Sequence, residues 1–513
     1  MTALVTGVAA CLLLPAWAQA PALSEAPRAP TALPSLGDGS DMTLSAERNI
    51  GDRIARELYR DPDYIEDPIL DEYIQSLWRP LVVSALARGD MGAEMQERFA
   101  WKILLGKDRS INAFALPGGY MGVHLGLISV VSSRDELASV MAHELSHVTQ
   151  RHIARSMSAQ SRMTPIMIGT MILGLLAASK SPQSAQALIV GGQAAAIQNQ
   201  LSFSRDMERE ADRVGYGVMS EAGFDPQGFV SMFGKLQQAS ALNDNGSFPY
   251  LRSHPMTSER MADMQSRQQL LGNRAARDTP DLEHAIMAAR AKVLSQPGVD
   301  LLRSWTQEAA DTQLARQPVA KQVSVLYAAA LAQMTLRDPA LAQRWLARLM
   351  PLVQNDAPAF RLVQLLKADL ANQSGDMPGV LAALSALPPT TPVRRPELLA
   401  RVQARTRMGA SPALGEDLAL LRNGLQERPD DGQAWQVLAS AWLAQGRPLQ
   451  ALRAEGEAQL ARMDYSGAID RFKAAQDLAR KQPLQGADHI EAAIVDARLR
   501  LVQSLWREQL LER

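Results

Sequence analysis

The sequence predicts an α+β protein that is predominantly helical, with a first domain that holds one small sheet and an all-α repeat domain behind it. Three observations predict this class. Apolar residues follow a helical period along most of the 513-residue chain. Aromatic residues are sparse at 5%, while the helix formers Ala and Leu are plentiful. Runs of β-prone residues separated by turn residues are convincing only between residues 99 and 131.

The composition is that of a globular protein of more than one domain. The chain has 47% hydrophobic and 21% charged residues and a formal net charge of −1. Its length exceeds that of one ordinary domain. A nearly neutral chain offers no electrostatic attraction for nucleic acid, so we expect no nucleic-acid partner.

The N-terminus predicts export. Residues 1–20, "MTALVTGVAACLLLPAWAQA", are uncharged and end in small residues, which is typical of a secretory signal peptide. We place cleavage after Ala18, because Pro21 disfavours a cut directly before it; the alternative for this segment is a short buried helix. Residues 21–40 are rich in Pro and Ser and predict a flexible leader. Cys11 is the only cysteine, so the mature chain has no disulfide.

Residues 41–275 form the predicted first domain. Helical spacing from residue 43 to about 86 precedes the β-prone stretch, in which Gly118-Gly119 predicts a hairpin turn. The next helix begins with a capping box of Ser133 and Glu136. Its apolar stripe is formed by Leu137, Val140, Met141, Leu145 and Val148.

Two apolar, glycine-containing segments follow, at residues 164–179 and 184–198. Each is too short to cross a bilayer alone, which argues against an intramembrane protein with several spans. Two interpretations stay open. The segments form a buried pair of helices, or they form an apolar flap that makes peripheral contact with a membrane or an unfolded protein.

Residues 276–513 form the predicted repeat domain. Prolines recur at intervals of 34 to 39 residues, at Pro339, Pro378, Pro412, Pro448 and Pro483, and several precede a helix-like start. A period near 34 with two helices per unit is typical of a tetratricopeptide solenoid. The alternative is an irregular helical bundle.

The motif "HELSH" on the capped helix contains side chains that can bind a metal ion and transfer protons. His143 and His147 are four residues apart and therefore lie on one helical face, where both imidazoles can bind one Zn²⁺. Glu144 lies beside the metal and can take a proton from the attacking water and return it to the leaving amine. The pattern predicts a zincin-like metallopeptidase, whose zinc polarises the scissile carbonyl.

A catalytic zinc needs a third protein ligand. His152 is five residues beyond His147, far round an ideal helix, and is expected at the surface. The segment "EREAD" offers a better donor. Glu208 can bind the metal, and Asp212, four residues on, can accept the ring N–H of a ligating histidine. Glu210 points nearly the opposite way. Taken alone, this cluster would be a solvated helix start.

Four stretches resemble the gluzincin peptidases of the HtpX, Oma and CAAX-prenyl-protease group. They are "INAFALPGGYMGVHLGLI", "ELASVMAHELSHVTQRH", "EREADRVGYGVMSEAGFDP" and "SHPMTSER". The likeness is strongest to the periplasmic BepA type, which joins such a domain to C-terminal tetratricopeptide repeats. The resemblance implies His143, His147 and Glu208 as zinc ligands, Glu144 as the general base and Asp212 as the partner of a ligand.

The resemblance also implies residues that spacing alone does not indicate. His254 either stabilises the oxyanion or turns onto the zinc as a self-inhibiting fourth ligand. Asn112 and Ala113 lie in a strand expected to hold an extended substrate through its backbone, although an internal strand without a ligand is the alternative. Arg260 is expected near the substrate.

The leading hypothesis is a periplasmic zinc endopeptidase with a helical-repeat recognition arm. The resemblance implies misassembled outer-membrane β-barrel proteins as clients and the barrel-assembly machinery as a partner. The alternative hypothesis is a chaperone-like assembly factor whose proteolytic site is normally closed by His254.

Overall fold

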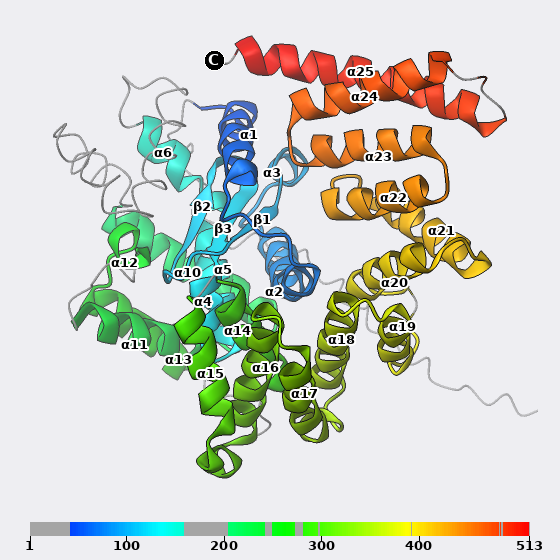
Figure 1. Cartoon of the computed structure of the whole chain (residues 1–513). Coiled ribbons are helices and arrows are strands. Elements are labelled where there is room, and N and C mark those ends of the chain that lie inside the picture. The colour runs from blue at the N-terminus through cyan, green and yellow to red at the C-terminus, as the bar shows by residue number, and fades with distance from the viewer. Residues whose placement is uncertain are drawn as a thin grey trace, which may run out of the picture.

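The computed structural model describes residues 42–158, 204–241, 249–271, 281–295, 298–390, 392–481, 483 and 486–511. The predicted signal peptide, the leader and the apolar segments at 164–179 and 184–198 lie outside the described residues. The described part is mainly helical with one small sheet, as the sequence predicts (Figure 1).

Ten α-helices form within the described residues before position 272. They are α1 (Leu44–Arg60), α2 (Pro68–Ala87), α3 (Ala93–Arg98), α4 (Leu125–Val130), α5 (Arg134–Thr149), α6 (His152–Ser158), α10 (Arg205–Glu221), α11 (Gln227–Ala241), α12 (Tyr250–Ser253) and α13 (Ser258–Leu271).

The second half of the chain is helical throughout its described residues. Its helices are α14 (Leu282–Leu294), α15 (Val299–Ala310), α16 (Val319–Thr335), α17 (Pro339–Val353), α18 (Ala357–Gln373), α19 (Met377–Ser385), α20 (Arg395–Met408), α21 (Pro412–Glu427), α22 (Gly432–Ala444), α23 (Pro448–Ala461), α24 (Tyr465–Lys481) and α25 (Ala487–Leu511), with a 3₁₀ turn, η2, at Thr312–Arg316. Four of the five recurring prolines lie in the first turn of a helix, and only Pro483 does not. The tetratricopeptide assignment itself stays a prediction.

The sheet has the strand order β1-β3-β2. Its strands are β1 (Lys102–Gly106), β2 (Ala113–Leu116) and β3 (Tyr120–His124). β3 runs parallel to β1 and antiparallel to β2, with Ala113 opposite Val123. The predicted hairpin turn is present as the 3₁₀ turn η1 (Pro117–Gly119), where φ is 73° at Gly118 and 83° at Gly119. Only glycine adopts such angles without strain.

The helix α5 begins where the capping box predicts. Ser133 Oγ accepts a hydrogen bond from Glu136 N at 3.1 Å. The return bond differs from the prediction, because Glu136 Oε2 accepts from Ser132 N, at 2.6 Å, and not from Ser133 N. The predicted apolar stripe is buried, and so is the polar face of α5, since α2, α10, α11 and β2 all pack on it. This burial removes the HExxH residues from bulk water.

One apolar core extends across the predicted domain boundary at residues 275 and 276. It runs from Ile69 in α2 to Leu370 in α18 and includes α14 and α16. α14 packs on both α2 and α4. The first helices of the predicted repeat domain therefore share a core with the predicted peptidase domain.

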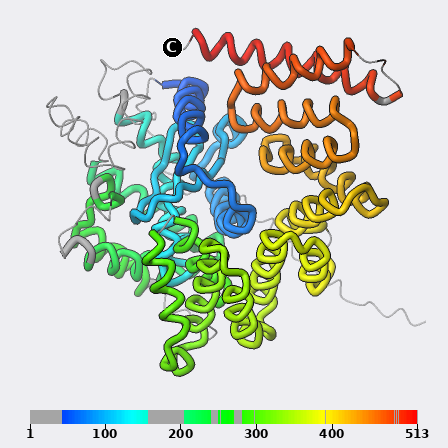
Figure 2. Tube along the Cα trace, in the orientation of Figure 1, coloured from blue at the N-terminus to red at the C-terminus, as the bar shows by residue number. Residues whose placement is uncertain are grey.

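The later helices curve away from the sheet and return to it (Figure 2). On their return they form ion pairs with the first domain, Lys102 Nζ–Asp430 Oδ2 at 2.8 Å and Arg462 Nη2–Glu66 Oε2 at 2.5 Å. A cavity of about 450 Å³ lies between the two parts, and its wall includes Trp101 of the first domain and Arg395 of α20. Among the described helices, none has the length and apolar composition needed to cross a membrane.

A buried arginine connects helices from both sides of the predicted boundary. Arg290 of α14 is 5% exposed. Its guanidinium donates to Asp67, the N-cap of α2, at 2.7 Å and to Tyr327 Oη of α16 at 3.1 Å. Asp369 of α18 lies 3.4 Å from the same guanidinium. Removing the cation would leave Asp67 buried without its charged partner.

We expect Arg290→Ala to lower the free energy of unfolding by about 3–5 kcal/mol, the cost of breaking a buried ion pair from one side. Urea unfolding of the whole chain measures this change. Arg303→Ala, at an exposed position of α15, is the control and should change stability by less than about 0.5 kcal/mol. Equal effects of the two substitutions would contradict the role given to Arg290.

Candidate metal centre

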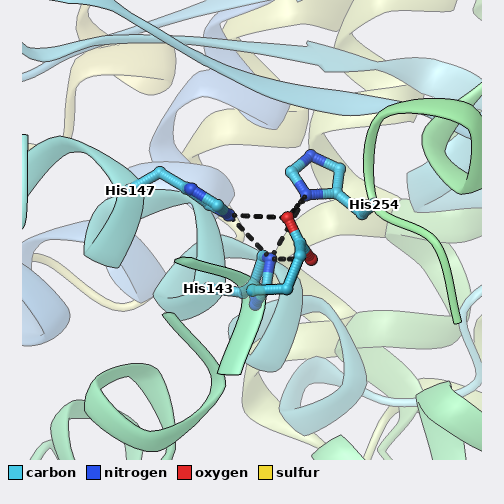
Figure 3. Close-up of side chains that lie close together, drawn as sticks. His143, His147 and His254 are labelled. Carbon is cyan, nitrogen blue, oxygen red and sulfur yellow. Dashed lines mark hydrogen bonds and ion pairs between the residues drawn. The ribbon is translucent and has the colours of Figure 1, made fainter. Parts of the chain in front are cut away.

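Two histidines of α5 turn their Nε2 atoms toward one point. His143 and His147 are 1% and 0% exposed, and their Nε2 atoms lie 3.0 Å apart (Figure 3). Two nitrogen lone pairs repel one another at that distance unless a proton or a cation lies between them. The residues therefore fit a shared metal ion, which would satisfy both lone pairs.

Glu208 of α10 and His254, which directly follows α12, complete a four-residue group. Glu208 carboxylate oxygens lie 3.5 Å from His143 Nε2 and 3.5 Å from His147 Nε2. His254 Nδ1 lies 3.0 Å from Glu208 Oε1 and 3.4 Å from His143 Nε2. One donor atom of each residue lies within 4.8 Å of all the others. Three imidazoles and one carboxylate suit tetrahedral zinc.

His254 lies where a fourth ligand would lie. Its ring stacks on Tyr250 with centroids 4.6 Å apart, and its Nδ1 faces the other donors. This position fits a fourth metal ligand, and the choice between the two roles that the resemblance implies stays a prediction. Sequence reasoning missed Tyr250, which is 3% exposed; a tyrosine before "LRSH" carries no local signal of a stacking role.

Asp212 lies behind His143. Its Oδ1 is 2.9 Å from His143 Nδ1, so the carboxylate is placed to accept the ring proton and fix the tautomer that presents Nε2. Asp212 is in turn held by Arg260, which donates through Nε at 2.6 Å and Nη2 at 2.7 Å. Two parallel bonds of this kind define the orientation of the carboxylate.

The structure corrects the prediction for Arg260. Its side chain is 3% exposed and lies behind the ligands, not beside a substrate. Besides its two bonds to Asp212, Nη1 lies 2.8 Å from Glu208 Oε2 and donates to the Pro255 carbonyl at 2.9 Å. Packing between α10 and α13 brings the guanidinium there, and no pattern in the sequence indicates that packing.

The structure also corrects the prediction for His152, which is buried and not at the surface. α5 ends at Thr149, and Arg151 has a φ of 53°, so the chain turns before α6 begins at His152. The turn brings His152 Nδ1 to 2.9 Å from His147 Nδ1. Its Nε2 lies 3.0 Å from Glu210 Oε2. An ideal helix would not have placed it there.

Glu144 lies between the metal-binding group and the sheet. Its side chain is fully buried. Its Oε2 accepts a hydrogen bond from Ala115 N of β2 at 2.9 Å. Its Oε1 lies 3.4 Å from His254 Nε2 without an accepted hydrogen bond. One carboxylate oxygen is thus held by the strand, while the other faces the group of ligands.

The strand β2 is an edge of the sheet, as the prediction of a substrate-holding strand requires. The Asn112 carbonyl accepts from His124 N at 3.0 Å. It therefore points into the sheet and away from the outer side of β2, so this orientation does not support the predicted backbone contact between Asn112 and a substrate. Backbone groups alternate in direction along an antiparallel strand, so Ala113 and Ala115 face the outer side. Of the two residues predicted to contact a substrate, only Ala113 has backbone groups that face the outer side of β2.

The electrostatics of the centre favour a cation. Burial lowers the pKa of His143, but hydrogen bonds with Asp212 and Glu208 outweigh it and raise the pKa to about 9. Burial raises the pKa of Glu208, but the charge of His254 and the hydrogen bond with His143 hold it well below its usual range. Burial and the charge of His143 lower the pKa of His147 well below the ordinary value.

Comparison with known proteins places this centre in a family context. Residues 73–268 match the sequence profile of Peptidase family M48. The beta-barrel assembly-enhancing protease of Escherichia coli strain K12 is 30% identical over 467 residues, which are 89% of each chain. A putative beta-barrel assembly-enhancing protease of Vibrio cholerae is 37% identical over 53% of this chain, which spans about half (54%) of that relative. The mitochondrial metalloendopeptidase OMA1 of Schizosaccharomyces pombe is 27% identical over 48% of this chain and 67% of its own length.

Zinc binding should release a proton from His143. With a pKa of about 9, the metal-free imidazole is protonated at pH 7, and ligation requires the neutral form. We expect about one proton per zinc at pH 7 and a weaker affinity for zinc at lower pH. Calorimetry in buffers of different ionisation enthalpy measures the release.

Asp212→Asn is the comparison variant, because it removes a charge that raises the pKa of His143, and it should release fewer protons. Equal release in both proteins would contradict this assignment. In the metal-free protein the raised pKa stabilises the fold below pH 6.5, and this contribution is lost as the pH rises through about 9.

Proposed function

Because the chain belongs to peptidase family M48 and is a zinc metallopeptidase, we propose that it is a periplasmic endopeptidase that degrades misassembled outer-membrane β-barrel proteins. The observation that carries the catalytic part is the buried group of His143, His147, Glu208 and His254 beside Glu144. The similarity to proteases named for beta-barrel assembly extends through most of the repeat region, which supports the choice of client.

The proposed roles follow from position. His143, His147 and Glu208 would hold the zinc, and the bound ion would supply the Lewis-acid chemistry that polarises a scissile carbonyl and acidifies a water. Glu144 takes the proton of that water and gives it to the leaving amine. Its hydrogen bond from Ala115 N keeps the carboxylate at the edge of β2. An extended substrate added along that edge would meet the outward-facing backbone of Ala113 and lie across the centre.

His254 gives the enzyme a closed state. A catalytic zinc needs an open fourth position for water or substrate, and His254 Nδ1 lies where it would fill that position. Stacking on Tyr250 stabilises this placement. Proteolysis then requires His254 to move away, so that the resting enzyme is restrained until a client binds.

The repeat region is proposed as a tetratricopeptide-like recognition arm. Its return toward the sheet encloses a cavity with aromatic and charged walls, a setting that suits an extended segment of an unfolded chain. The proposed partner is the barrel-assembly machinery, and peripheral contact with the outer membrane would follow from that partnership. Residues 1–20 are proposed as the signal peptide that directs the chain to the periplasm.

A second function is favoured by the closed site. With His254 in place, the protein would bind clients without cutting them and act as a chaperone-like assembly factor. The two functions differ in their dependence on Glu144. Degradation requires its carboxylate, whereas client assembly through the repeat arm does not.

Glu144→Gln should lower the rate of client cleavage by about 10²–10⁴-fold, because the amide cannot take the proton. His254→Ala should raise the rate, because it opens the fourth position. The measurement follows cleavage of an unfolded β-barrel protein by the zinc-loaded full chain. His489→Ala, at an exposed position of α25, is the matched histidine control and should leave the rate unchanged.

Undiminished cleavage by Glu144→Gln would overturn its role as the base. A lower rate in His254→Ala would show that His254 stabilises the transition state and does not restrain the enzyme by filling the fourth position on the zinc. In cells, loss of client degradation with normal barrel assembly in Glu144→Gln would support the second function alongside the first; loss of both would tie assembly to proteolysis.

A further inference from the structure

The two histidine ligands of α5 are backed by different chemical groups. His143 Nδ1 faces the Asp212 carboxylate at 2.9 Å. His147 Nδ1 faces another imidazole, that of His152, at 2.9 Å. His152 is fully buried, and its other nitrogen lies 3.0 Å from Glu210 Oε2. The zinc centre thus contains a His147–His152–Glu210 chain that the HExxH motif does not describe.

The positions of the protons along this chain follow from the metal site. If His147 binds zinc through Nε2, its Nδ1 carries a proton and donates it in a hydrogen bond. The His152 Nδ1 atom must then accept, so the proton of His152 lies on Nε2 and is donated to Glu210. Arg155 Nη1 donates to the same Glu210 oxygen at 2.9 Å and holds the carboxylate in place. Each bond has one possible direction.

We propose that His152 is the positioning residue of the zinc ligand His147. It holds the His147 ring through a neutral imidazole, and Glu210 fixes the tautomer of His152 that can accept. Partners behind a metal-binding histidine orient the ring and hold the proton on the nitrogen that does not bind. The inference concerns the zinc centre alone and does not depend on which proteins the enzyme cleaves.

A strained turn supports this interpretation. Arg151, with its φ of 53°, is one of few non-glycine residues with a positive φ in the described chain. Such a conformation costs free energy and persists where surrounding contacts hold it. Arg151 Nε donates to the buried carboxylate of Glu47 in α1 at 3.0 Å, and Nη2 donates to the Met42 carbonyl. The turn that delivers His152 to His147 is therefore anchored from a helix 104 residues earlier.

The test compares His152→Leu with His152→Asn in the full chain. Leucine removes the acceptor, whereas the Oδ1 atom of asparagine can take the place of Nδ1. We expect His152→Leu to weaken zinc binding by about 10–100-fold in chelator competition, and His152→Asn to recover most of that loss. The absorption spectrum of the Co²⁺-substituted protein should change in His152→Leu and return toward that of the wild type in His152→Asn. His489→Leu is the matched control.

Unchanged zinc affinity in His152→Leu, or equal impairment of both variants, would overturn the proposal. Thermal unfolding of the metal-free variants shows whether the fold persists. Should His152→Leu unfold, Glu210→Leu provides the second measurement. Glu210 is partly exposed, so its replacement is tolerated more easily, and without it the proton of His152 is no longer held on Nε2. Weaker zinc binding in Glu210→Leu supports the proposal, and unchanged binding overturns it.

Discussion

The metal centre holds several charged side chains away from water, and the elements around it supply the groups that compensate this burial. Four donor side chains and Glu144 are withdrawn from water, and an isolated ionised group in such a place would cost several kcal/mol. Each is compensated by a named partner. Arg260 pairs with Glu208, and Ala115 N donates to Glu144. Asp212, His152 and Glu208 lie within 3.0 Å of His143, His147 and His254, respectively. The helices α10 and α13 and the edge strand β2 are placed so that these partners reach the centre.

Much of the centre was predictable because it is encoded by local periodicity. A spacing of four residues on a helix places His143 beside His147, and the same spacing relates Glu208 to Asp212. The capping box predicted where α5 begins, and the glycine pair predicted the hairpin between β2 and β3. In each of these cases the relevant interaction joins residues a few positions apart, so the sequence alone carries it.

The parts that escaped prediction depend on distant contacts. His152 was expected at the surface because an ideal helix was extended past Thr149, whereas Glu47 and Met42 stabilise a turn at Arg151. Arg260 was expected near substrate, but the packing of α13 on α10 directs it to Asp212. The shared core across residues 275 and 276 depends likewise on α14 packing against α2 and α4. None of these pairings has a signature in a single sequence.

The shared core has an evolutionary consequence. A catalytic domain can be transferred between proteins as a unit only if no apolar core is shared across its boundary. Here α14 packs on α2 and α4 within one apolar core, so a cut between residues 275 and 276 would expose apolar side chains of both parts to water. Substitutions in α14 to α18 are therefore constrained by the apolar core that they share with α2 and α4, whereas the distal helices are constrained through ion pairs such as Lys102–Asp430 and Arg462–Glu66.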